Sequence, residues 1–104
     1  MTNQRLIDLF SCEDYFESEY RKTGYWSAEE GLMLVVADSE IEEISTRDGT
    51  FLIVGRPGVD GLSFGYRQGM TGLWAYHPIE QSFSYMSNSV AELVSGWTSG
   101  ELSV

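Results

Sequence analysis

The chain has 104 residues, of which 42% are hydrophobic and 13% aromatic, and its formal net charge is −10. This size and composition predict a single folded domain, residues 1–104, with its own hydrophobic core, and they argue against disorder. Because 16 acidic residues face only 6 Lys and Arg, no basic footprint exists for nucleic-acid phosphates or for an anionic membrane, and we expect neither as a partner.

Three negative features indicate the cellular compartment. Cys12 is the single cysteine and cannot form an internal disulfide. The start, Met1–Arg5, lacks the charged-then-apolar layout of a secretory signal, and no apolar run approaches the roughly 20 residues that span a bilayer. Together these features predict a cytoplasmic protein.

The first segment, residues 3–22, has helical periodicity, since Leu6 and Phe10 share one face. Ser11, with Asp14 three residues later, can cap a second helix. One interrupted helix and two short helices therefore both fit this segment.

The next segment combines helical and strand signals. Residues 27–30 form a capping box, which favours a turn or a helical turn, and the continuous apolar run that follows predicts a strand at 32–37. Residues 40–44 fit either an edge strand or a helical turn. Asp48 and Gly49 then give a strong turn signal.

Four short apolar runs dominate the second half, at a spacing of about ten residues that is typical of successive strands. They lie at 51–54, 62–67, 73–76 and 83–86 and are separated by turn residues. Strand alternation puts Leu62, Phe64 and Tyr66 on one face. In the run 73–76 both faces carry apolar bulk, so either both are covered or one is a binding surface.

An amphipathic helix is predicted to close the chain. Asn88 or Ser89 caps it and Glu92 completes the capping box, while Gly100 ends it. Its apolar stripe consists of Val90, Leu93, Val94 and Trp97. The fold class that follows is α+β, with an antiparallel meander of about four to six strands packed against N-terminal and C-terminal helices.

Catalytic and metal-binding chemistry has little support in the sequence. His77 is the only histidine and Cys12 lies far from it, so a nucleophile and base pair is not indicated, and zinc would lack ligands. The glycine-rich segment 55–61 precedes a strand and lacks a Lys-Ser/Thr pair, so it predicts a hairpin turn rather than a phosphate-binding loop. We therefore expect no enzyme activity, no metal and no cofactor.

A carboxylate cluster is the main candidate for a binding surface. It comprises Asp38, Glu40, Glu42 and Glu43, and most of the remaining acids also lie in the first half of the chain. Such a run on one short element is commonly a solvated face that keeps a protein soluble. It can also steer a basic protein partner toward the domain.

Asp60 and Trp74 form a second, weaker candidate group for the same surface. Aromatic side chains such as Trp74 concentrate at protein interfaces, although most aromatic residues of a small domain belong to its core. Arg56 and Arg67 flank the first hairpin and are expected to pair with nearby acids such as Asp60.

Several pieces of the second half occur in the order that one known family shows. They are Ile53-Val54-Gly55, Gly58-Val59-Asp60-Gly61, Leu62-Ser63-Phe64-Gly65, Gly72-Leu73-Trp74-Ala75-Tyr76 and Ser89-Val90-Ala91-Glu92-Leu93-Val94. On these residues the region 51–97 resembles the SMI1/KNR4 family, also called the SUKH superfamily. The resemblance implies an α+β fold and an intracellular, non-catalytic protein-binding role. Many bacterial relatives are immunity proteins that neutralise toxin domains, often nucleases, and fungal relatives regulate cell-wall synthesis.

The leading functional hypothesis is therefore a cytoplasmic protein-binding domain, acting as an immunity protein that neutralises a basic, nuclease-type toxin. The alternative is a small-molecule-binding or regulatory domain with a pocket between sheet and helices. A homodimer that pairs through an exposed edge of the meander is a further alternative.

Overall fold

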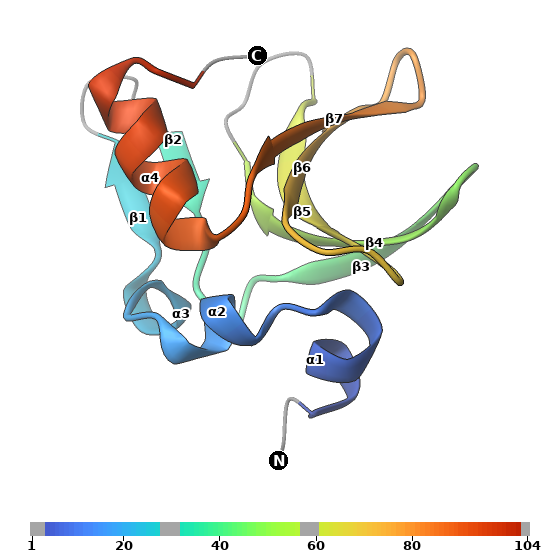
Figure 1. The fold of residues 1–104 in the computed structure, drawn as a ribbon, viewed down its shortest axis with the longest axis horizontal. Coiled ribbons are helices and arrows are strands. Elements are labelled where there is room, and N and C mark those ends of the chain that lie inside the picture. Colours follow the sequence, from blue (N-terminus) through green and yellow to red (C-terminus); the bar gives the residue numbers. More distant parts are fainter. Residues whose placement is uncertain (1–3, 28–31, 57–60, 103–104) are drawn as a thin grey trace.

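The computed structural model describes residues 4–27, 32–56 and 61–102, and Figure 1 shows their arrangement. The chain begins with three short helices, α1 (Gln4–Phe10), α2 (Glu13–Glu17) and α3 (Tyr20–Thr23). The segment 3–22 was expected to form one interrupted helix or two short helices, and the structure instead divides it into three.

The first break corrects the predicted cap. Ser11 has a φ of +54°, in the left-handed region, and Cys12 occupies the position before α2. The capping prediction at Ser11 is therefore wrong by one residue. Asp14, its expected partner, uses its carboxylate in contacts with distant parts of the chain (below).

Two strands then form a small antiparallel sheet, β1 (Tyr25–Ser27) with β2 (Leu32–Val35). The strand predicted at 32–37 is confirmed over residues 32–35, where β2 ends. Ser27, which was expected to open a helical turn, belongs to β1, and residues 28–30 of that prediction lie outside the described residues.

The predicted meander is confirmed as a five-stranded antiparallel sheet in which each strand pairs with the next one along the chain. Its strands are β3 (Glu42–Thr46), β4 (Gly49–Gly55), β5 (Ser63–Arg67), β6 (Leu73–His77) and β7 (Ser82–Ser87). The segment 40–44 was expected to be either an edge strand or a helical turn, and its residues 42–44 belong to the edge strand β3. Val36, which directly follows β2 and precedes β3 in the chain, donates its N–H to the Val54 carbonyl at 2.7 Å. The segment after β2 therefore lies along the same edge of β4 as β3 does.

The main core lies between the outer face of this sheet and the helices. Leu52, Phe64, Tyr66, Leu73 and Ala75 are fully or almost fully buried there. The predicted last helix is confirmed as α4 (Val90–Ser99), whose Ser89 hydroxyl accepts the Glu92 N–H at 3.2 Å and whose end is a left-handed Gly100. Val90, Leu93 and Val94 of α4 complete the core.

One carboxylate joins three elements of this core. Asp14 of α2 accepts the Tyr66 hydroxyl of β5 at 2.9 and 3.0 Å and the Val90 N–H of α4 at 2.7 Å. Because Val90 is the first residue of α4, its N–H has no partner within the helix. Asp14 therefore satisfies a helix N-terminus and a buried hydroxyl together.

The sheet is strongly curled. The rings of Phe51 on β4 and Phe83 on β7 lie 5.2 Å apart, although a flat sheet would separate these strands by about 14 Å at the usual strand spacing. At the open side, the Arg47 guanidinium of the β3–β4 turn donates to the Gln81 carbonyl of the β6–β7 turn at 3.4 Å. Figure 1 shows α1, α2 and α4 outside the curl, with its concave side open.

Gly65, in the centre of β5, permits this curvature. A Cβ added there would clash with the Leu52 carbonyl oxygen and would lie 2.9 Å from Cζ of Phe51, so the Phe51 ring rests directly over the glycine. Register shifts between β4 and β5 and between β6 and β7 bend the sheet further. The concave face consequently holds a small aromatic cluster of its own.

Candidate functional site

The predicted carboxylate cluster is largely paired with the protein's own arginines. Glu43 receives two hydrogen bonds from Arg5, at 2.9 and 3.0 Å. Asp38 lies 3.4 Å from Arg21, and Glu42 lies 2.5 Å from Arg56. These arginines come from α1, α3 and the end of β4, so three contacts distant in the sequence reduce the local negative charge.

Glu40 is the exception among the four, because within the described residues no cation lies within salt-bridge distance of its carboxylate. Glu40 and Glu42 line a hollow of about 430 Å³ together with Arg56, Met33 and Val36. The structure therefore brings together these two predicted residues. Glu43, on the adjacent position of β3, must project to the opposite face of the sheet.

Trp74, the aromatic residue predicted for binding, lies on the concave face of the sheet. Its register partners on neighbouring strands are Gly65 and Tyr85, and its indole packs edge-on against Tyr85 with 5.4 Å between ring centroids. We call the side chains gathered on this face the concave aromatic surface: Phe51, Trp74, Tyr76, Phe83 and Tyr85.

Exposure differs sharply within the concave aromatic surface. Phe51 is fully buried beneath its neighbours, while Tyr85 is 50% exposed and Trp74, Tyr76 and Phe83 are half-buried. No helix among residues 4–27, 32–56 and 61–102 covers this face (Figure 1). The sequence left open whether both faces of β6 are covered, and the structure leaves this one partly accessible.

Arg67 lies on the same face of the sheet. Its guanidinium stands 4.9 Å from the Trp74 ring centroid and 4.2 Å from that of Phe83. Among the described residues it makes no ion pair, and its guanidinium contacts aromatic faces; its pairing with a nearby acid such as Asp60 stays a prediction. Asp60, the acid named for that pairing and for partner binding, lies outside the described residues.

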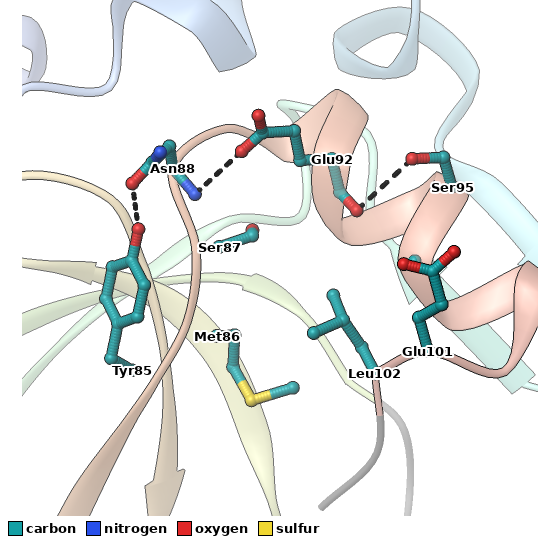
Figure 2. A pocket seen from close by; sticks show the side chains of 9 residues that line it. Tyr85, Met86, Ser87, Asn88, Glu92, Ser95, Glu101 and Leu102 are labelled. Carbon is teal, nitrogen blue, oxygen red and sulfur yellow. Dashed lines mark hydrogen bonds between the residues drawn. The ribbon is translucent and has the colours of Figure 1, made fainter.

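A second hollow, of about 390 Å³, lies between β7 and α4. We call it the β7–α4 pocket, and Figure 2 shows its lining. The residues are Tyr85, Met86, Ser87, Asn88, Glu92, Ser95, Gly96, Glu101 and Leu102. The Tyr85 hydroxyl donates to Asn88 Oδ1, and the Asn88 N–H donates to Glu92 Oε2 at 3.1 Å.

The candidate groups for catalysis are not brought together. His77, which ends β6, contacts the Ser84 hydroxyl through Nε2 at 3.1 Å. Cys12 is fully buried, and its thiol donates to the Leu6 carbonyl at 3.4 Å. Burial raises the pKa of this thiol to about 12, which keeps it protonated and unreactive.

Tyrosine ionisation is likewise suppressed inside the domain. Burial, followed by the charge of Asp14, raises the pKa of Tyr66, so its hydroxyl remains a hydrogen-bond donor.

Among the residues that the structure describes, no group of three His, Cys, Asp or Glu side chains could hold a metal ion. No helix in those parts of the chain is long and apolar enough to cross a membrane.

Trp74, which the sequence named, lies on the concave aromatic surface, and the Ser89–Glu92 helix cap that the sequence predicted is confirmed, but the sequence named neither Glu101 nor the β7–α4 pocket. The only available signal for the pocket was that acidic residues and no basic residue follow the last strand. The sequence assigned Glu92 to the helix cap, and this role is confirmed. Glu92 also lines the β7–α4 pocket, a position that its role in the cap does not indicate.

No family model, no curated protein and no solved structure matches this chain. The resemblance of residues 51–97 to the SMI1/KNR4 family therefore stays a prediction.

Proposed function

We propose that this chain is a cytoplasmic, non-catalytic protein-binding domain whose partner is basic, and that it acts as an immunity protein against a nuclease-type toxin. The observation that carries the proposal is the concave aromatic surface, with Tyr85 half exposed beside Trp74 on a sheet face that no described helix covers. Rigid aromatic side chains at such a position are the usual anchors of protein interfaces.

Charge supports a basic partner. The three arginine–carboxylate pairs leave the net charge at −10, because each pair is neutral and both of its members are already counted in that total. A negative field of this kind accelerates encounter with a cationic protein, and the acceleration falls as salt is added. A nuclease is cationic where it binds phosphates, so an acidic domain can occupy that cleft.

Local charge defines the geometry of docking. Arg67 lies at the centre of the concave aromatic surface, while Asp48 and Glu80 lie exposed in the two turns that border its open side. The partner should therefore place apolar or neutral groups over Trp74 and Tyr85 and its basic side chains at the margin.

Titration calorimetry with the toxin-like product of the neighbouring gene tests the proposal. We expect binding that weakens as salt is raised, and a loss of about thirtyfold in affinity for Tyr85→Ala, the effect of removing an interface anchor. Trp26→Ala is the matched control, because Trp26 is 57% exposed on β1, away from this surface. Absence of binding at low ionic strength, or equal losses for both variants, would contradict the proposal.

A further inference from the structure

The strand β7 forms one edge of the five-stranded sheet. β7 pairs with β6 on one side and with no other strand among the described residues, so alternate N–H and C=O groups along it point away from the sheet. Its sequence, Ser82–Ser87, contains neither a charge nor a proline, the two features that usually protect an edge. The opposite edge, β3, carries Glu42 and Glu43.

The β7–α4 pocket opens beside this edge. Four consecutive residues, 85–88, line one side of it. The side chains of Met86 and Leu102 lie in its centre in Figure 2, while Glu92 and Glu101 stand around them on and after α4. No basic side chain lines the pocket. Its lining thus combines an apolar interior with two carboxylates that lack a cationic partner in the described residues.

We propose that the edge of β7 and the β7–α4 pocket together bind an extended segment of the basic partner, with one lysine or arginine side chain entering the pocket. The inference rests on the proposed function and names the chemistry of the docking segment. The segment extends the sheet by main-chain hydrogen bonds to β7, a common way of recognising extended peptides.

The pocket suits a long basic side chain in both polarity and size. The methylene stem packs on Met86 and Leu102, and the charged end reaches Glu92 and Glu101, forming charge-assisted hydrogen bonds. The volume of about 390 Å³ falls within the range of natural ligand pockets. Tyr85 belongs to both this pocket and the concave aromatic surface, so the two sites are continuous.

Charge also excludes a second copy of the chain as the favoured occupant. Pairing β7 with its own symmetry mate would bring two copies of Glu92 and Glu101 to one interface, in a protein whose net charge is already −10. Light scattering at millimolar concentration provides the check: a monomer agrees with the proposal, whereas a dimer that Ser84→Pro disrupts would overturn it.

Two blocked pentapeptides serve as probes, each with valine and threonine flanking a central residue that is lysine in one and norleucine in the other. Binding to the full ¹⁵N-labelled chain is followed by amide chemical shifts. We expect the lysine peptide to shift signals of β7 and α4 and to bind about fivefold more tightly than the norleucine peptide. Equal affinities, or shifts located elsewhere, would overturn the proposal.

Charge-matched variants make the test specific. Glu92→Gln with Glu101→Gln should abolish the preference for lysine, because the amide at position 92 can still accept the Asn88 N–H while both charges are lost. Glu13→Gln with Glu17→Gln is the control, since it makes the same change in charge at exposed positions of α2. A preference for lysine that survives in the first variant would overturn the proposal.

The toxin-like partner separates this inference from the proposed function. We expect Glu92→Gln with Glu101→Gln to weaken the partner about tenfold while the α2 control changes binding less than twofold. A partner that binds the wild type and both variants equally would refute the pocket and leave the proposed function intact. A partner that does not bind at all, while the lysine peptide still does, would refute the proposed function alone.

Discussion

Replacing Asp14 should destabilise the domain more than any other single carboxylate change, because one side chain joins α2, β5 and α4. In Asp14→Ala the Tyr66 hydroxyl, on a fully buried side chain, and the Val90 N–H both lose their acceptor. A hydrogen bond to a charged group is worth about 1.5–3 kcal/mol, and a carboxylate at a helix N-terminus adds about 0.3–1 kcal/mol.

These contributions predict a loss of about 3–5 kcal/mol, reduced slightly by the better helix propensity of alanine. Tyr66→Phe should cost less, about 1–2 kcal/mol, because the partly exposed carboxylate keeps its bond to Val90. Asp14→Asn should fall between the two, since its amide oxygen can still accept one hydrogen bond.

Urea unfolding followed by tryptophan fluorescence measures these differences. With an m-value of roughly 1–2 kcal/mol per molar, Asp14→Ala should lower the unfolding midpoint by about 1.5–5 M. A loss below about 1 kcal/mol, or a larger loss for Tyr66→Phe than for Asp14→Ala, would refute the view that this carboxylate joins the three elements.

Four further predictions concern the sheet, the buried thiol and the acidic cluster. Gly65→Ala should cost about 3 kcal/mol or more in urea unfolding, because the added Cβ clashes with the Leu52 carbonyl and displaces the Phe51 ring; a loss below about 1 kcal/mol would contradict this. Cys12, whose pKa burial raises from its ordinary value of 9.0 to about 12, should resist iodoacetamide at pH 8 as long as the domain is folded, as mass spectrometry would show. Since the unfolded thiol ionises first, the free energy of unfolding should fall as pH rises from 9.0 toward about 12, and Cys12→Ala should flatten that fall; an unchanged slope would argue against the burial of this thiol. Glu40→Gln should weaken the basic partner more than Glu43→Gln, whose carboxylate is held by Arg5, and calorimetry giving the reverse order would contradict the pairing.

The elements that local chemistry specifies could be predicted from the sequence. Strand alternation predicted Phe64 and Tyr66 on the core face, where both lie. The capping box of Ser89 and Glu92 predicted the start of α4. Each of these patterns is determined by residues within one element, so no knowledge of the remaining chain is needed.

The curl of the sheet could not be predicted in the same way. It depends on Gly65 lying beneath Phe51, a contact between neighbouring strands whose register the sequence does not state. The same holds for Arg5 and Glu43, which are 38 residues apart and meet only because α1 packs beside β3. The sequence therefore shows the acidic cluster but not the pairing of Asp38, Glu42 and Glu43 with arginines.

The site depends on contacts of the same long-range kind. Trp74 could be named because both faces of its strand carry apolar bulk and aromatic residues concentrate at interfaces, yet its neighbours Tyr85 and Arg67 come from two other strands. Glu101 is a candidate for binding because the chain after α4 lies beside β7 and places this residue in the lining of the β7–α4 pocket, which the sequence does not show.

Hydroxyl-radical footprinting of the complex with the basic partner tests the central claim most directly, because it reports which aromatic side chains the partner covers. Tyr85 and Trp74 should lose most of their reactivity on binding, while Trp26, 57% exposed on β1, should keep its own. Protection of Trp26 with unchanged reactivity at Tyr85 would place the partner on the other side of the domain and contradict the account.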